Sequence, residues 1–204
     1  MSSVSNNTPG TRLELWIKSR ANLAAFTTLL QYGMYLDTRQ GCSISELLCS
    51  LPGFSEEYIV NNVQTIFLNG FPADDLQQQI SGKNAVLAIS AAMPGLAGAI
   101  FRKGGFHASL RTAPDETNRQ PVKNTVIHLR LKLFNMIAKD RGVQILHEGC
   151  TIQAATLADF LLYREIPAKD ICRAQSNKNE ISPEEPGFFP QGNQFIHLSI
   201  KQQA

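Results

Sequence analysis

The chain has 204 residues, of which 43% are hydrophobic and 18% are charged, as in an ordinary folded, water-soluble protein. Its net charge of +2 is too small to indicate a nucleic acid or a membrane surface as the partner. The N-terminus lacks the basic and apolar segments of a secretory signal. The most apolar window, residues 85–101, contains Pro94 and suits a buried strand and turn better than a membrane span. We therefore expect a cytoplasmic protein outside the membrane, with residues 1–11 as a tail.

The first predicted elements follow this tail. Residues 13–18 alternate between apolar and polar side chains, which predicts a half-buried strand. Residues 19–33 form either a helix or an irregular hairpin connection, and the spacing of their apolar residues along one helical face favours the helix. Residues 35–37 are expected to form a short strand.

The next stretch predicts a helix at residues 43–51. Ser43 and Glu46 have the spacing of a capping box, and Pro52-Gly53 ends the helix. Two strands follow, at residues 63–68 and 85–90. The first ends at Asn69-Gly70, a dipeptide suited to a tight turn, and the second is almost wholly apolar, as a central strand would be.

Residues 112–125 contain two prolines and almost no apolar side chains, which predicts a linker or long loop. We therefore expect one domain at residues 12–111 and a second α+β domain at residues 126–204. The second begins with an alternating strand at residues 127–133, although residues 134–139 fit a helix as well. Its other predicted elements are a helix and a final strand, at residues 154–162 and 195–200.

Two short motifs occur in both halves. Gly41-Cys42-Ser43-Ile44 is repeated as Gly149-Cys150-Thr151-Ile152, and each is expected to precede a helical stretch. Gly82-Lys83-Asn84 and Gly192-Asn193-Gln194 each lead into a strand. Such matches arise from an internal duplication or by chance, and both explanations stay open.

The predicted order is strand, connection, strand, helix, strand ending in Asn-Gly, polar loop and strand, over residues 12–98. The residues that carry this order are Ser43–Leu51, Ile66–Gly70, Asp74-Asp75-Leu76, Val86–Ser90 and Pro94–Gly98. The order resembles the ubiquitin-like β-grasp fold, and most of all the group of the molybdopterin-synthase small subunit and the thiamine sulfur carriers. The resemblance implies an α+β protein with a β-grasp-like N-terminal half. The second half is then another α+β half or a diverged tandem copy.

The same resemblance implies a chemistry at a C-terminal Gly-Gly, whose carboxylate is adenylated and converted into a thiocarboxylate. Here more than a hundred residues follow Gly98, so that position offers only a peptide carbonyl. Gly104-Gly105 follow Arg102-Lys103 as in a modifier tail before cleavage. The resemblance therefore leaves open a precursor that is cut after Gly105, while the simpler explanation is a glycine turn between two strands.

Residues 102–132 carry seven Lys or Arg residues against two Asp or Glu residues. Backbone N–H groups of a glycine-rich run beside cationic side chains can hold an anion. We predict a site for an anion or a protein partner, formed by Gly95, Gly98, Arg102, Lys103, Gly104, Gly105, His107 and Arg111. Alternatively the segment is a solvated loop, or a surface for single-stranded RNA on which Phe101 and Phe106 stack between basic residues that extend to Lys132.

Nothing else in the sequence forms a catalytic or metal-binding pattern. Cys42, Cys49, Cys150 and Cys172 contain no CxxC pair, and we expect buried free thiols. The four histidines lack the spacing of metal ligands, and Asp74-Asp75 has the character of loop carboxylates. We predict neither a metal, nor a cofactor, nor a catalytic residue.

The sequence thus predicts a non-catalytic binding or scaffold module that engages a protein or a small anionic partner. Exposed strand edges of a β-grasp sheet can add a strand from another chain, which gives this function a physical route. Two alternatives remain: a sulfur-carrier or modifier precursor cleaved after Gly105, and an RNA-binding module that uses residues 102–132.

Overall fold

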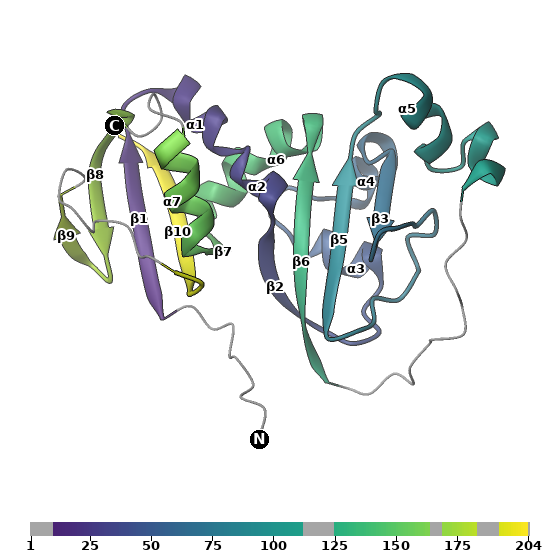
Figure 1. Ribbon diagram of the computed structural model, residues 1–204, viewed down its shortest axis with the longest axis horizontal. Helices are drawn as coiled ribbons and strands as arrows, with labels where there is room; N and C mark the ends of the chain where they lie inside the picture. The colour runs from purple at the N-terminus through teal and green to yellow at the C-terminus, as the bar shows by residue number, and fades with distance from the viewer. Residues whose placement is uncertain (1–9, 112–124, 164–168, 183–191, 204) are drawn as a thin grey trace. The chain divides into compact units, whose positions relative to one another are not determined.

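The computed structural model describes residues 10–111, 125–163, 169–182 and 192–203, and the chain is an α+β protein (Figure 1). It divides into two compact units. Unit 1 combines residues 1–35 with residues 143–204, and unit 2 is the continuous segment of residues 36–142. Unit 1 is therefore built from both ends of the chain.

Unit 1 has a central pair of parallel strands. Its strands are β1 (Thr11–Ile17), β7 (Cys150–Gln153), β8 (Ile171–Ser176), β9 (Asn179–Ile181) and β10 (Phe195–Gln202). They lie in the order β7-β10-β1-β8-β9. β1 and β10 run side by side in parallel (Figure 1), whereas β10 with β7, β1 with β8 and β8 with β9 are antiparallel.

The helices of unit 1 pack against the apolar residues of these strands. They are α1 (Arg20–Phe26), α2 (Leu29–Tyr32) and α7 (Ala154–Tyr163). Leu13, Leu15 and Ile17 of β1 are fully buried. The rings of Phe26 and Phe160 meet with their centroids 5.1 Å apart, so α1 and α7 share one core.

Unit 2 also has a central parallel pair. Its strands are β2 (Met34–Arg39, of which residues 36–39 belong to this unit), β3 (Thr65–Leu68), β4 (Phe71–Pro72), β5 (Asn84–Ser90) and β6 (Val126–Phe134). They lie in the order β4-β3-β5-β6-β2. β5 and β6 are parallel, and β3 is antiparallel to both β4 and β5.

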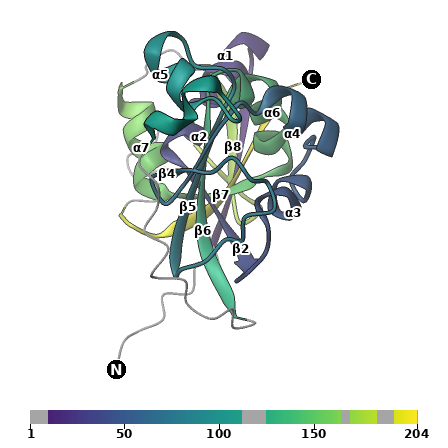
Figure 2. The same ribbon diagram turned by 90° about the vertical axis from the view of Figure 1, so that its right-hand side faces the viewer.

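The helical elements of unit 2 are α3 (Ile44–Cys49), α4 (Glu56–Asn62), α5 (Gly95–Phe101), the short 3-10 helix η1 (Phe106–Leu110) and the first part of α6 (Asn135–Glu148). The predicted capping box of α3 is confirmed. The Ser43 hydroxyl accepts from the Glu46 N–H at 3.1 Å, and the Glu46 carboxylate accepts from the Ser43 N–H at 2.8 Å. Figure 2 shows α3 and α4 on the same side of β5 and β6.

The two faces of the unit 2 sheet differ in burial. Alternate residues of β5 and β6, such as Leu87, Ile89 and Leu131, are fully buried on one face. The residues between them, such as Ala88 and Lys132, are only half-buried. We call this second face the outer face. It holds the cavity discussed at the end of the Results.

Several predicted elements are confirmed. Residues 19–33 form the two short helices α1 and α2, and residues 127–133 form β6, after which α6 begins at Asn135. Asn69 and Gly70 form the predicted turn, with positive φ angles of 53° and 86°. The Gly/Pro-rich segment that begins at Pro94 was expected to be a turn, and this was wrong: Gly95–Phe101 is helical.

The predicted domains do not coincide with the two units. β1 has its described partners in β8 and β10, far along the chain, and β5 pairs with β6, which follows the predicted boundary. The predicted linker lies, apart from Thr125, outside the described residues. Contiguous domains do not fit the two units, because each central strand pair joins segments on opposite sides of the predicted boundary.

The repeated motif has different roles in its two copies. Gly41 and Gly149 both adopt a positive φ, of 87° and 104°. Ser43 then caps a helix, whereas Thr151 lies within β7, so the expectation that both copies precede a helix directly was wrong for the second. The motif alone therefore does not establish a duplication.

Candidate functional site

The predicted site forms a small helical lobe, which we define as residues 95–111. It consists of α5, a turn at residues 102–105, η1 and Arg111. The Phe101 ring packs on Phe67 of β3 with centroids 5.1 Å apart, which attaches the lobe to the outer face. The structure thus brings all eight predicted site residues into one lobe, but it gives them different roles.

Arg111 is an internal structural residue of this lobe. Its side chain is only 8% exposed and pairs with the Asp74 carboxylate at 2.5 Å. It also donates from Nε to the Ile100 carbonyl at 2.7 Å, and from a terminal nitrogen to the Arg102 carbonyl. A guanidinium that already has these acceptors has little capacity left for an external anion.

Asp74 occupies the position that the sequence assigned to a bound anion. Its second carboxylate oxygen accepts from the Gly104 N–H at 3.1 Å, while the first accepts from Arg111. We call Asp74, Gly104 and Arg111 the clasp. The glycine-rich turn and its cation do hold a carboxylate, as predicted for this residue pattern, but the carboxylate belongs to the same chain.

The two remaining cations of the turn differ in their contacts. Lys103 donates its backbone N–H to the Gln64 carbonyl at 2.6 Å, and Arg102 donates from Nε to the Gln64 side chain at 3.3 Å. The Lys103 ammonium is buried and has no hydrogen-bond partner among the described residues. Burial lowers the pKa of Lys103, and the negative charge of Asp74 partly offsets this.

Two of the predicted glycines are required by the backbone. A Cβ on Gly98 would lie 1.7 Å from the Met93 carbonyl oxygen, so no side chain fits there. Gly104 has a φ of 63°, in the left-handed region that glycine adopts at no steric cost. These glycines shape the lobe, and only the Gly104 N–H takes part in binding a carboxylate.

The outer surface of the lobe is apolar. Leu96, Phe106 and Leu110 are 74%, 95% and 66% exposed. The exposed His107 ring lies edge-on to Phe106, with ring centroids 5.2 Å apart. The polar groups of the lobe are therefore used internally, while its large apolar side chains face solvent.

The wider basic segment does not form one described surface. Arg119 and Lys123 lie outside the described residues, and Arg111 is buried in the clasp. Arg130 and Lys132 alternate with buried leucines along β6 and lie on the outer face. On the same strand, His128 contacts Asp37 at 2.6 Å. The described part of the chain thus offers only some of the cations that an RNA surface was expected to use.

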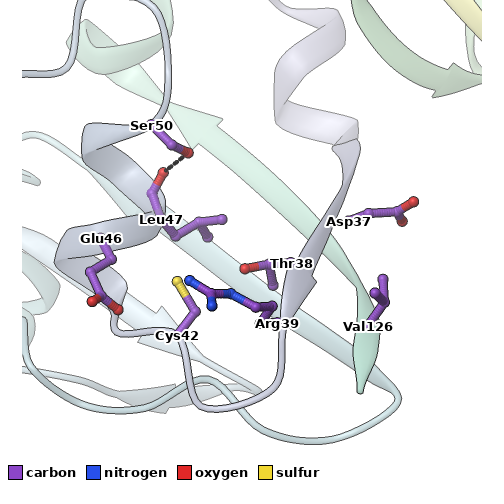
Figure 3. A pocket seen from close by; sticks show the side chains of 8 residues that line it. All are labelled: Asp37, Thr38, Arg39, Cys42, Glu46, Leu47, Ser50 and Val126. Atoms are coloured by element: carbon purple, nitrogen blue, oxygen red, sulfur yellow. Dashed lines mark hydrogen bonds between the residues drawn. The ribbon is translucent and has the colours of Figure 1, made fainter. Parts of the chain in front are cut away.

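A separate pocket of about 430 Å³ lies between β2 and α3. Figure 3 shows Arg39 pointing from β2 toward α3, where Cys42 and Glu46 line the pocket. The pKa of Glu46 is lowered, first by the hydrogen bond from the Ser43 N–H and then by that from the Ser43 hydroxyl. Arg39 and Glu46 carry opposite charges, and Asp37 and Glu46 are the described carboxylates that line the pocket together with the Cys42 thiol.

The prediction of buried free thiols is correct only in part. The four cysteines are free, but only Cys150 is buried, and Cys49 is exposed on the outside of α3. Burial raises the pKa of Cys150 to about 12, so this thiol stays protonated and cannot act as a nucleophile at neutral pH. Among the described residues, no three His, Cys, Asp or Glu side chains are close enough to share a metal ion.

No helix in the described part of the chain has the length and apolar character needed to cross a bilayer. Comparison with known proteins gives no match to a protein-family model, a curated protein or a solved structure. The residues and their geometry are therefore the basis for inferring function.

The sequence pattern located the lobe but missed the residue that organises it. Asp74 was treated as a loop carboxylate, because at least 28 positions of sequence separate it from the cations of the lobe and only folding brings them together. The signal available in the sequence was the pair Asp74-Asp75, which lies between the Asn69-Gly70 turn and the next predicted strand. Its position indicates a loop that returns over β3. That signal does not reveal which of the two carboxylates points inward.

Proposed function

We propose that the protein is a non-catalytic binding module and that its lobe contacts a protein partner. The observation that carries the proposal is the exposure of Leu96, Phe106 and Leu110 on a segment that is fixed from within by the clasp. Leu96 lies on α5, and Phe106 and Leu110 lie on η1, which contacts α5. Exposed apolar side chains on adjoining elements commonly mark an interaction surface. Phe106, which is 95% exposed, is the expected anchor.

The fixed backbone of the lobe favours binding. A partner gains most from contacts that do not require it to order a loop first, because ordering costs conformational entropy. The Arg111 side chain joins the last residue of the lobe to the C-terminal end of α5 and the start of the turn by bonding to the Ile100 and Arg102 carbonyls. The lobe can therefore present Phe106 and Leu110 with little loss of freedom on binding.

A small anionic partner is less well supported than a protein. The Gly104 N–H and the Arg111 guanidinium already hold the Asp74 carboxylate, so an external anion would have to displace this residue to reach them. The Lys103 ammonium has no hydrogen-bond partner among the described residues, but it is buried. A peptide or protein surface needs no such displacement, since it contacts side chains that point outward.

The second candidate function is a sulfur-carrier or modifier precursor that is cleaved after Gly105, and the strand pairing argues against it. Cleavage after Gly105 would separate β1 from β8 and β10, its described partners, and β5 from β6. The released fragment would expose the fully buried Leu13 and Leu87. Intact-mass measurement on the protein from its own cells tests this: a stable fragment that ends at Gly105, especially with an added sulfur, would favour the precursor.

We also propose a relationship of the chain to β-grasp proteins. The structure has β1, α1 and α2, β2, α3, β3 with its Asn69-Gly70 turn, and β5 in the predicted order, with α4 inserted before β3 and β4 inserted before β5. This order is the support for the relationship. It does not extend to the sulfur-carrier chemistry, because the glycines of the lobe lie within the chain and have no free carboxylate.

The test of the partner surface starts from the protein that co-purifies with the full-length chain. The double substitution F106S/L110S should weaken that complex by about thirtyfold or more, as expected for the loss of an apolar anchor worth about 2 kcal/mol. The matched control is Val60→Ser on α4, an apolar residue that is 56% exposed in the same unit. Equal affinity of F106S/L110S and the parent protein would exclude the lobe as the contact surface.

A further inference from the structure

A cavity of about 270 Å³ opens at the carboxyl ends of the parallel strands β5 and β6. Its walls come from β3, from the ends of β5 and β6, and from Met93, which follows β5. All of these residues belong to unit 2. The volume is well above the roughly 150 Å³ that is sufficient to enclose a benzene molecule in a protein core.

One wall carries a buried hydroxyl that has nothing to bond to. Thr65 is only 2% exposed, and its Oγ1 has no hydrogen-bond partner among the described residues. A buried hydroxyl without a partner is destabilising, and native proteins rarely keep one without a reason. A ligand in the cavity that accepts a hydrogen bond would satisfy it.

A second hydroxyl lies beside the first. Ser90 is 4% exposed and is the direct cross-strand neighbour of Thr65 in the β3–β5 pair, so both side chains lie on the outer face. Its Oγ accepts from the Asn135 amide at 2.9 Å, a bond that does not use the Ser90 hydroxyl proton. Both residues line the cavity, next to each other where β3 and β5 pair.

Asn135 is held in an uncommon backbone conformation at this place. Its φ of 52° lies in the left-handed region, which asparagine tolerates better than most residues. This conformation joins β6 to α6 directly and allows the Asn135 amide to reach Ser90. Such local strain is often found where a structure positions groups for binding.

The rest of the cavity determines the character of its ligand. Phe67, Met93 and Phe134 supply apolar walls, and no charged residue is among the described residues that line it. A charged ligand would lose its hydration without gaining a counter-charge, which is strongly unfavourable. Apolar walls with a few directed polar groups are the usual composition of a small-molecule site.

We infer that this cavity binds a small neutral molecule with one or two rings and a hydrogen-bonding oxygen or nitrogen atom. The ring lies against Phe67, Met93 and Phe134, and its polar atom bonds to the Thr65 hydroxyl. The inference is independent of the lobe and of its partner, because it uses neither the clasp nor the exposed residues of the lobe.

The test uses benzene, phenol and benzoate as probes on the full-length protein, followed by amide chemical shifts in NMR titrations. These probes share one ring but differ in hydrogen bonding and charge. We expect phenol to shift the amides of Thr65, Ser90 and Asn135 and to bind about five- to tenfold more tightly than benzene, as one hydrogen bond allows. Benzoate should not bind there.

Two variants identify the cavity as the place of binding. Thr65→Val keeps the shape of the side chain and removes the hydroxyl, so it should abolish the preference for phenol over benzene. Ala88→Leu adds volume to the wall and should weaken both neutral probes. In the ligand-free protein, Thr65→Val should leave the thermal midpoint unchanged or raised, because the lost hydroxyl had no partner.

Three results would overturn the inference: equal affinities for benzene and phenol, binding that Thr65→Val does not alter, or a lowered thermal midpoint for unliganded Thr65→Val. The last result would show that the hydroxyl has a structural partner. Absence of binding by both benzene and phenol would overturn the inference as well.

Discussion

Units 1 and 2 share a strand-helix-strand-strand-strand succession, but each is completed by a strand from a different place. In unit 2 the elements are β2, α3, α4, β3, β4 and β5, with one helix more than the β7, α7, β8, β9 and β10 of unit 1. In both, the last strand gains a parallel neighbour from outside the succession. That neighbour is β6 in unit 2 and β1 in unit 1.

The position of the added strand differs between the units. β6 lies between β5 and β2, the last and first strands of its succession, whereas β1 lies between β10 and β8, the last and second strands. The shared succession supports the proposal of an internal duplication. The different insertion shows that, if the halves share an origin, their strand pairing has diverged.

The difference also affects the cohesion of each unit. In unit 1, Thr11 pairs with Ile196, so the central pair joins the two ends of the chain. In unit 2, Asn84 pairs with His128, within one continuous segment. Closing a longer loop costs more conformational entropy, so unit 1 depends more on its single added strand than unit 2 does.

The largest effect should follow from removal of β1. Deletion of residues 1–17 takes away Leu13, Leu15 and Ile17, which are fully buried, and loss of one such side chain alone costs about 2–5 kcal/mol. We expect unit 1 to lose its hydrogen-exchange protection while residues 36–142 keep theirs. Deletion of residues 1–9 is the control, and equal loss in both units would contradict the comparison.

The next effect concerns the clasp of unit 2. Asp74→Asn removes the negative charge that pairs with the buried Arg111 guanidinium and lies near the Lys103 ammonium. We expect a loss of about 2–3 kcal/mol in the free energy of unfolding, with exchange increased mainly in residues 95–111.

Glu57→Gln, at an exposed position of α4, removes the same charge without touching the clasp. It should change the free energy of unfolding by less than about 0.5 kcal/mol. If both variants behave alike in a urea titration, Asp74 does not organise the lobe.

A smaller effect compares the two motif glycines. Gly41→Ala and Gly149→Ala both place a side chain at a positive φ, which costs about 1 kcal/mol. A Cβ on Gly149 would also lie 2.4 Å from the His197 ring of β10. Gly149→Ala should therefore lower the thermal midpoint further than Gly41→Ala, and the reverse order would show that the His197 contact does not constrain unit 1.

The smallest predicted effect is a pH dependence of unit 1. Burial, followed by the positive charge of Arg12, lowers the pKa of His197 below its ordinary value of 6.5, and Glu14 partly offsets this. Between the folded and unfolded pKa values the unfolded chain binds more protons, so the free energy of unfolding falls as the pH drops below 6.5. Below the pKa of His197 in the folded protein, both states bind the proton, and the free energy of unfolding no longer falls for this reason.

The pH effect is measured as the difference between the parent protein and His197→Gln in urea titrations at about pH 7.5 and about pH 5.5. The parent should lose more stability than the variant on acidification. Equal losses would assign the pH dependence to other groups.

Local elements could be predicted from the sequence because their signals are local. The capping box at Ser43 and Glu46, the Asn69-Gly70 turn and the alternating pattern of β6 all depend on residues a few positions apart. The helix α5 was missed because Gly95 and Gly98 have low helix propensity, which packing against β3 outweighs.

The pairings between distant segments could not be predicted in the same way. Nothing near β1 specifies β10 as its neighbour, and nothing near Asp74 specifies Arg111. The candidate site was therefore located by its unusual composition, and its binding of an external anion or partner stays a prediction. In the structure, Gly104 and Arg111 hold the Asp74 carboxylate of the same chain. The cavity beside Thr65 has no local signal, since β3, β5 and β6 form it together.

The central claim, that the lobe contacts a protein partner, is tested most directly by site-specific photo-cross-linking. A benzophenone side chain replaces Phe106 in one sample and Val60 in the other, and both full-length proteins are irradiated in their own cells. If the lobe contacts the partner, position 106 gives one dominant adduct of defined mass and position 60 gives none of that mass. The same adduct from both positions, or none from position 106 while the partner still co-purifies, would contradict the claim.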